Sequence, residues 1–439
     1  MKRIFTASIL LASSLIAGAQ PREWTLAECI GHALENNITI QQSAINVESK
    51  EVAVSSAKNR RLPGVSGSAS QNFSFGRGLT ADNTYANANT TSTSFSLGAD
   101  VPVFSGLQNV HNIALGKLDL EAATADLEKA KDDIRVAVAQ AYVQILYDME
   151  IVEVAESQVD IDQMQVERLS EMAANGKSSR AEVSAQEATL AQSQLSLTQA
   201  RNNLSLALLE LSQLLELPSP EGFAIARPNA DGIDDMLLMS PEDIYAEAVQ
   251  VKPAIKSEMV RLAYADRNIK LAKSGYIPTI SLNGGIGTNY YTSSGYASAN
   301  FGQQARNNFS QYLGLSLNVP IFDRLQTRNQ IRSAKLQKQN QELQVESVKK
   351  SLYKEIQQAY YNAVGARGKY LSSKVAAKSA QDAFELATAK YETGKSGITE
   401  FNESKTRLMS AESDLAKARF EYLYQSKLLE FYRGNDLVL

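Results

Sequence analysis

The sequence is poor in the residues on which catalytic and cross-linked proteins depend. Its 439 residues include one cysteine, two histidines and one tryptophan. The single cysteine, Cys29, excludes an internal disulfide. His32 and His111 lie far apart and in no zinc-binding spacing, and neither a nucleophile elbow nor a dinucleotide-binding glycine turn is present. We therefore expect no enzyme and no cofactor or metal site.

Basic clusters, prolines and long apolar runs are also scarce. The formal net charge is -4, and no basic patch with interleaved aromatic residues points to nucleic acid as a partner. Only 10 prolines interrupt the chain, and Ala, Ser, Gln, Leu and Glu dominate long stretches of it. This composition is typical of long helices. Beyond the N-terminal segment, no apolar run reaches the length of a membrane-spanning helix.

The N-terminal segment, 1–19, predicts a secretory signal peptide. Lys2 and Arg3 give a positive start, 4–16 is apolar, and Ala-Gly-Ala at 17–19 is a cleavage site of small residues. A membrane anchor is the alternative, but it needs about 20 apolar residues. Cys29 lies beyond the cleavage site, so it cannot be the lipid-bearing first residue of a lipoprotein.

An internal duplication is the strongest pattern in the sequence. The segment Leu-Pro-Gly-Val-Ser at 62–66 resembles Ile-Pro-Thr-Ile-Ser at 277–281. Further matches share one constant, slightly larger shift, namely 101–104 with 319–322, 140–142 with 358–360, and 176–178 with 394–396. Chance does not hold one register over about 100 residues. The sequence therefore predicts two structural repeats, 20–217 and 240–439, joined by a Pro- and Gly-rich linker at 218–239.

Each repeat has the same predicted order of one helix, two strands and a very long helical hairpin. The first helices are expected at 25–59 and 240–275, and the hairpin helices at 107–174, 179–216, 325–392 and 397–432. At about 1.5 Å per residue, the longest of these extends roughly 100 Å. No globular core needs a helix of that length, so it indicates a coiled coil or the wall of a tube.

Four segments alternate between apolar and small polar residues, namely 65–75, 94–103, 280–287 and 309–321. One interpretation is a small sheet with one face in water. The other is a transmembrane barrel whose apolar face meets lipid and whose Ser- and Asn-rich face lines a lumen. A barrel needs at least about eight strands, and lipid tolerates no open sheet edge. Four strands therefore require several chains to share one barrel, with 76–92 and 288–308 as outward-facing loops.

Both hairpin turns contain Gly-Lys-Ser, at 176–178 and 394–396. A phosphate-binding loop needs a further glycine five residues earlier, where Glu171 and Ala389 stand, and a preceding strand. We expect instead that the two glycines end their helices and that Ser178 and Ser396 cap the helices that follow.

With these motifs the chain resembles the outer-membrane efflux proteins of the TolC type over residues 25–433. The resemblance rests on the duplicated order, on the strand ends Val-Pro-Val-Phe-Ser-Gly and Val-Pro-Ile-Phe-Asp-Arg, and on the hairpin turns. Its most specific part is Tyr-Glu-Thr-Gly at 391–394, two acids three residues apart, and Leu-Ala-Lys-Ala-Arg-Phe-Glu-Tyr-Leu at 415–423.

The resemblance implies a mainly α fold with membrane β-barrel strands. Three chains form a homotrimer with one 12-stranded barrel in the cell outer membrane and a helical tunnel through the periplasm. The trimer is the exit duct of a tripartite efflux or type I secretion system for small molecules or polypeptides. A periplasmic adaptor and an inner-membrane pump of the RND or ABC type dock at the turns, here Gly176, Lys177, Gly394 and Lys395, and outer-membrane lipid surrounds the barrel.

The resemblance also assigns a selectivity ring. The family's paired acids match Glu400 and Glu403, with glutamate in place of aspartate. Three chains would bring six carboxylates to one narrow lumen, which attracts cations and repels anions. A pair of acids stabilised by the dipole at the start of a helix explains the same residues without a ring.

Three further residues correspond to contacts that hold the gate in the family. The gate tyrosine matches Tyr391, and its acidic partner on the first hairpin matches Glu182. The family's gate arginine falls on Ser396, so that tie is either missing or made by the neighbouring Lys395.

Two other classes of protein share some of these features. A periplasmic adaptor or a structural coiled-coil protein without a barrel would also have a signal peptide and long hairpins, but it leaves the four alternating segments unexplained. An exported enzyme would need a catalytic constellation, which the sequence does not supply.

Overall fold

The computed structural model describes residues 23–79, 84–228, 238–294 and 297–438. The predicted signal peptide lies outside these residues, as do residues 229–237 of the predicted linker. Within the described part of the chain, no helix has the length and apolar character needed to cross a membrane.

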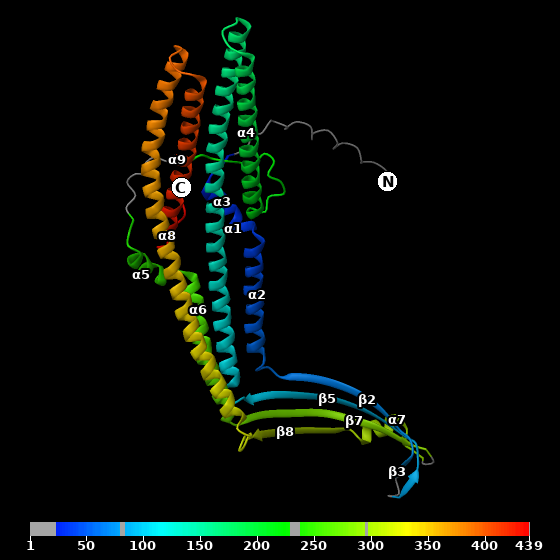
Figure 1. Cartoon of the computed structure of the whole chain (residues 1–439). Coiled ribbons are helices and arrows are strands. Elements are labelled where there is room, and N and C mark those ends of the chain that lie inside the picture. Colours follow the sequence, from blue (N-terminus) through cyan, green and yellow to red (C-terminus); the bar gives the residue numbers. More distant parts are fainter. Residues whose placement is uncertain (1–22, 80–83, 229–237, 295–296, 439) are drawn as a thin grey trace, which may run out of the picture. The chain divides into compact units, whose positions relative to one another are not determined.

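Two long helical hairpins dominate the fold (Figure 1). The first consists of α3 (Gln108–Ala174) and α4 (Arg180–Leu214), and the second of α8 (Gln326–Glu392) and α9 (Ile398–Tyr432). Each helix begins and ends close to its predicted bounds. No proline interrupts these segments, and residues that favour helix fill their surfaces, so α3 and α8 each continue for 67 residues.

The two shorter helical segments are each broken into two helices, where the sequence predicted one. The first contains α1 (Leu26–Asn36) and α2 (Ile38–Asn59). Asn37 between them is extended, donates its side-chain amide to the Leu214 carbonyl at 3.1 Å, and accepts from the Thr39 amide at 3.0 Å. In the second, α5 (Pro241–Val251) and α6 (Pro253–Lys273) meet where a proline forces the preceding residue to be extended. A 3₁₀ turn, η2 (Ser274–Tyr276), follows α6.

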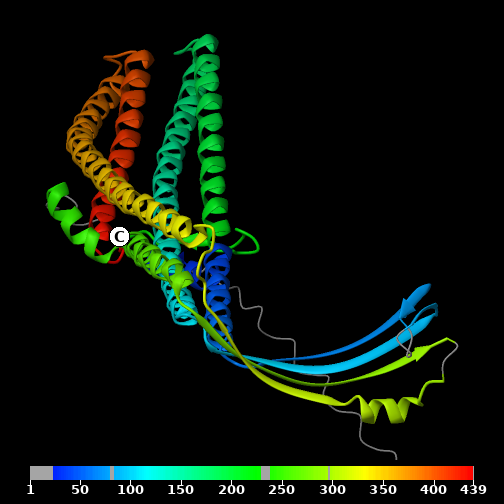
Figure 2. The same ribbon diagram turned by 90° about the horizontal axis from the view of Figure 1, so that it is seen from below.

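The four predicted strands form one antiparallel sheet, which Figures 1 and 2 show from two directions. Its strands are β2 (Gly64–Ser74), β5 (Thr90–Phe104), β7 (Thr279–Ser293) and β8 (Ser310–Asn318), in the order β2-β5-β7-β8. The central pair, β5 and β7, comes from different repeats, so the two repeats are joined through the middle of the sheet.

The register of the sheet separates the two kinds of residue on its two faces. Leu97 pairs with Ile286, and Leu282 with Leu315, on one face. On the other face Ser68 and Ser96 lie opposite each other, with their hydroxyls 2.8 Å apart. The predicted alternation is therefore confirmed, and the apolar face stays exposed on the single chain, where Leu315 is 70% accessible. Such a face is suited to contact with lipid.

The strand ends differ from the prediction in two places. β5 begins at Thr90 and β7 continues to Ser293, because their Thr- and Tyr-rich ends keep pairing, so the loops are shorter than expected. The short strands β3 (Arg77–Leu79) and β4 (Tyr85–Asn87) and the helix α7 (Phe301–Asn307) lie in those loops. β8 ends at Asn318, which pairs with the first residue of β7, Thr279, and does not continue to 321.

The described chain divides into two compact units that do not follow the two repeats. The first unit comprises the described residues up to 44, those of 126–255 and those of 348–439, and the second comprises those of 45–125 and 256–347. The second unit holds the four-stranded sheet. The first holds the hairpin ends and the main hydrophobic core. There Tyr142 lies beside the small parallel pair of β1 (Glu23–Trp24) and β6 (Ala224–Ile225), and its hydroxyl donates to the carbonyls of Trp24 and of Ala226, the residue after β6. The candidate site lies wholly in the first unit.

Candidate functional site

The two long hairpins reverse direction through the same backbone turn. Gly176 and Gly394 both have a φ of 72°, which glycine adopts without the steric cost that a side chain imposes. The amide of the next residue, Lys177 or Lys395, bonds the carbonyl five residues earlier at 2.8 Å in each turn. This hydrogen bond is the mark of a glycine C-cap. The prediction that both glycines end their helices is confirmed, and both lysine side chains are exposed.

The helix after the first turn is capped by its own side chains. Ser179 is the N-cap of α4 and forms a capping box with Glu182, whose carboxylate accepts from the Ser179 amide at 2.9 Å. The Ser178 hydroxyl donates to the same carboxylate at 2.6 Å. These hydrogen bonds, with Ser178 the largest contributor, lower the pKa of Glu182. The cap predicted at Ser178 is thus one residue further along the chain.

The helix after the second turn starts without such a cap. Gly397, the repeat counterpart of Ser179, is the N-cap of α9 and has no side chain to accept a hydrogen bond. The prediction that Ser396 caps α9 is therefore wrong, since its hydroxyl is buried without a hydrogen-bond partner among the described residues. Glu400, the counterpart of Glu182, instead lies 3.4 Å from the Lys390 ammonium, with both side chains about half exposed.

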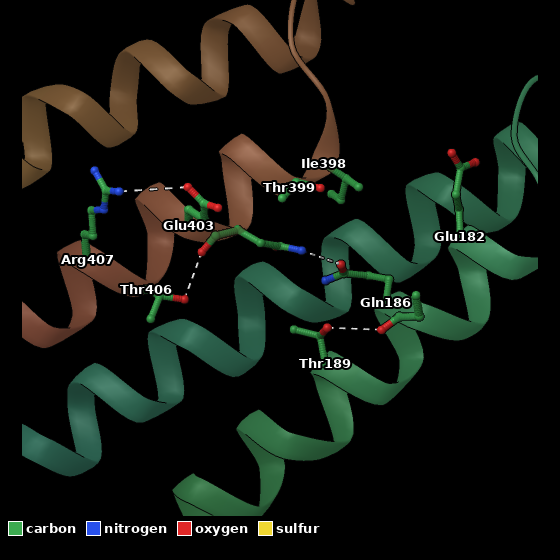
Figure 3. A pocket seen from close by; sticks show the side chains of 10 residues that line it. Glu182, Gln186, Thr189, Ile398, Thr399, Glu403, Thr406 and Arg407 are labelled. Atoms are coloured by element: carbon green, nitrogen blue, oxygen red, sulfur yellow. Dashed lines mark hydrogen bonds and ion pairs between the residues drawn. The ribbon is translucent and has the colours of Figure 1, made fainter.

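Glu403 lies one turn further along α9, at a pocket between α9 and α4 (Figure 3). The pocket has a volume of about 560 Å³, and Glu182 and Gln186 line it from α4. Glu403 is 64% exposed and lies 3.9 Å from the Arg407 guanidinium, which is itself 80% exposed. Glu400 is not part of this pocket. The two acids of the predicted ring therefore lie on neighbouring turns, and neither is held by a close, buried ion pair.

Tyr391 joins the second hairpin to the first, but its partner differs from the one expected. The Arg168 guanidinium of α3 lies 5.0 Å from the centre of the Tyr391 ring, and Phe401 packs against the same ring at 5.3 Å between centroids. Burial of the hydroxyl raises the pKa of Tyr391, Arg168 opposes this shift, and the charge of Glu182 adds to it. No hydrogen bond joins Tyr391 to Glu182 among the described residues.

The second expected contact, from Lys395, is also absent from the described part of the chain. Its side chain is exposed in the turn and forms no ion pair there. Arg168 supplies the positive charge between the hairpins instead. No local pattern in the sequence identifies this residue, because Arg168 and Tyr391 come from different repeats.

A buried polar cluster lies deeper between the hairpins and was missed by the sequence analysis. Asp162 of α3 forms an ion pair with Lys405 of α9, and the two side chains are 0% and 1% exposed. Gln186 donates to one Asp162 oxygen at 3.0 Å, and Ser193 donates to the other at 2.5 Å. Asn402 donates to the Gln186 side-chain oxygen at 3.2 Å. We call these five residues the buried polar layer.

The site offers charge rather than reactive groups. The described residues contain no group of three histidine, cysteine or acidic side chains that could hold a metal ion. Cys29 lies in the core, where burial raises the pKa of its thiol to about 12 and so keeps it unreactive. The hairpin ends instead present exposed carboxylate and ammonium groups to solvent.

Comparison with known proteins finds a family, relatives and a solved structure that match nearly the whole chain. The family model described as Outer membrane efflux protein matches residues 29–216 and 244–435. The outer membrane efflux protein BepC of Brucella suis is 21% identical over 429 residues, which cover 98% of this chain and 89% of BepC. The outer membrane protein TolC of Escherichia coli is 23% identical, over 96% of this chain and 84% of TolC. A crystal structure of CusC superposes with a TM-score of 0.76 at 17% identity, covering 93% of this chain and 92% of CusC.

Proposed function

Because this chain belongs to the outer membrane efflux protein family, it is an outer-membrane exit duct, and we propose that its hairpin ends form a cation-favouring gate. The protein extends from the outer membrane into the periplasm and is not an enzyme. It takes part in tripartite efflux and secretion systems with adaptors and pumps, and the homotrimer is characteristic of its fold. Family membership removes the alternatives of a barrel-less adaptor and an exported enzyme.

The different use of two equivalent glutamates supports the gate. Glu182 accepts the hydrogen bonds of the capping box of α4, whereas Glu400 is engaged by no cap and has only the half-exposed Lys390 ammonium nearby. Glu403 adds a second exposed carboxylate one turn away. In a trimer these two residues supply six carboxylates from the second hairpins alone. Negative charge concentrated at a narrow passage raises the local concentration of cations and repels anions.

The contact between Tyr391 and Arg168 would hold the gate. It lies between the hairpins, close to the turns, and combines ring packing with a cation–π contact. Such a contact is worth about 0.5–2 kcal/mol, which is strong enough to bias a closed arrangement and weak enough for a partner protein to break.

The exposed turns would receive the partner. Gly176, Lys177, Gly394 and Lys395 present two similar positively charged tips on each chain. A periplasmic adaptor could engage both kinds of tip through the same contacts, coupled to an inner-membrane pump of the RND or ABC type. Outer-membrane lipid would contact the apolar face of the sheet.

Ion selectivity of the purified trimer in planar bilayers tests the gate. We expect a cation-selective reversal potential in a salt gradient, and loss of most of that selectivity in Glu400→Gln/Glu403→Gln. Glu210→Gln, an exposed glutamate near the other end of α4, is the matched control and should leave the potential unchanged. An unaltered potential in the double variant would exclude the proposed ring.

A further inference from the structure

The buried polar layer differs in kind from the contacts at the hairpin ends. Asp162 and Lys405 are completely enclosed, and the Asp162 carboxylate accepts hydrogen bonds from Lys405, Gln186 and Ser193. Separating a buried pair strands a charge in a medium of low dielectric, whereas an exposed pair exchanges its partner for water at little cost. The contacts at the hairpin ends are exposed or half-buried. Separating the two hairpins at their ends therefore costs far less free energy than separating them at the buried polar layer.

The layer is also absent from the equivalent positions of the repeat. The shift that aligns the turns at 176–178 and 394–396 relates Asp162 to Ala380 and Lys405 to Glu187. An alanine and an exposed glutamate cannot form a buried ion pair. Where six hairpins from three chains alternate around a ring, the tie therefore exists only between the two hairpins of one chain. The junctions between different chains lack it.

We propose that Asp162 and Lys405 are positioning residues that fix the second hairpin to the first at one level, so that only the hairpin ends beyond this level move when the duct opens. The inference rests on the proposed gate. The moving part then comprises roughly the last 12 residues of α3 and α8 with their turns and the first turns of α4 and α9, which include Tyr391 and Glu400, whereas Glu403 lies at the level of the layer. The helices below the layer remain a rigid wall.

Single-channel conductance of the full-length trimer separates movement at the two levels. The variant Arg168→Ala/Tyr391→Ala removes the contact at the ends and should raise conductance severalfold over the native trimer. Into this variant we would introduce Gln186→Cys and Asn402→Cys, in a Cys29→Ala background, and bridge them with a short reducible thiosulfonate cross-linker. Because the Gln186 and Asn402 side chains meet at 3.2 Å, the bridge pins the hairpins at the layer.

We expect the bridge to leave the raised conductance unchanged within about twofold, since the layer does not part when the ends do. A return to the native conductance, reversed by reductant, would overturn the inference, because it would show that opening separates the hairpins at the layer. The unbridged cysteine variant is the control for loss of the Gln186 and Asn402 amides. A matched bridge between cysteines at 168 and 391 should hold the duct at low conductance until it is reduced.

Hydrogen exchange of the native trimer tests the layer without assuming a gate. Amides of 401–404, whose carbonyl acceptors lie at the start of α9 beyond the layer, should exchange at least about tenfold faster than those of 406–412. In Asp162→Asn/Lys405→Gln, which removes both charges together, the fast-exchanging region should extend further along α9 while the trimer still forms. If the Arg168→Ala/Tyr391→Ala variant leaves conductance unchanged, the proposed gate is excluded, and the exchange pattern alone then tests the buried polar layer. Uniform protection across 401–412 in the native trimer would refute the layer.

Discussion

The two hairpin ends have nearly the same sequence and the same turn, yet the helices that leave them begin differently. The first turn reads Asn-Gly-Lys-Ser-Ser and the second Thr-Gly-Lys-Ser-Gly, and both glycines at the second position are left-handed. The residue at the fifth position, Ser179 or Gly397, determines whether the following helix has a side-chain cap. Ser179 engages Glu182 in a reciprocal cap, whereas Gly397 leaves Glu400 with only an exposed lysine nearby.

This difference shows how a duplicated unit can acquire one structural end and one functional end. The carboxylate is kept in both copies, so its presence alone does not reveal its role. The hydroxyl three residues before it determines whether the residue forms a capping box at the start of its helix. The same division continues along the helices, where Lys405 is buried and its counterpart Glu187 is exposed.

The largest expected effect is the loss of stability when Lys405 is replaced. Lys405→Met leaves the Asp162 carboxylate buried without its counter-charge, which costs about 3–5 kcal/mol. We expect a large loss of heat resistance of the purified trimer and a lower midpoint of denaturant unfolding. The repeat counterpart provides the control, since Glu187→Met changes an exposed side chain and should shift stability by no more than about 0.5 kcal/mol. Equal losses in the two variants would contradict the distinction.

Local patterns were sufficient to predict most of the fold. Period-two alternation identified all four strands of the sheet, and the glycines at 176 and 394 marked the helix ends, because each depends only on neighbouring residues. The break at Asn37 could not be predicted in this way, since its side chain is fixed by the carbonyl of Leu214, far along the sequence. The break before Pro253 follows from the proline itself, which disfavours a helical conformation at the preceding residue.

The candidate site was predicted less completely, for the same physical reason. Glu400, Glu403 and Tyr391 were identified through their own segment, which carries a recognisable pattern. Their partners were not, because Arg168 and Asp162 belong to α3, in the other repeat, and only packing of the hairpins brings them close. One local signal did exist: Lys405 lies on the face of α9 that buries Phe401 and Leu408, where a charged residue requires a buried partner.

A smaller effect is expected from making the two ends alike. Gly397→Ser introduces the missing cap at a residue whose φ of -84° suits serine, and the added Cβ meets no atom within 4 Å. The cap should stabilise the start of α9 by a few tenths of a kcal/mol and draw the Glu400 carboxylate toward its own backbone. Cation selectivity in planar bilayers should then fall, though less than in Glu400→Gln. Cation selectivity that stays at the native value in Gly397→Ser would show that the introduced cap does not affect the role of Glu400.

The smallest effect concerns the pH dependence of the capped end. Hydrogen bonds from the Ser178 hydroxyl and the Ser179 amide lower the pKa of Glu182 from its ordinary value of 4.5, so the stabilisation is complete above that pH and is lost as the pH falls through the lowered value. Hydrogen exchange of the amides of 180–183 should therefore lose protection on acidification below about pH 4.5, beyond the intrinsic change of exchange rate with pH. Ser178→Ala should weaken this loss, because the Ser178 hydroxyl contributes most to the lowered pKa. Ser179→Gly should change it less, since the amide of residue 179 still donates to the Glu182 carboxylate in that variant. A pH dependence that is unchanged in Ser178→Ala would contradict this assignment.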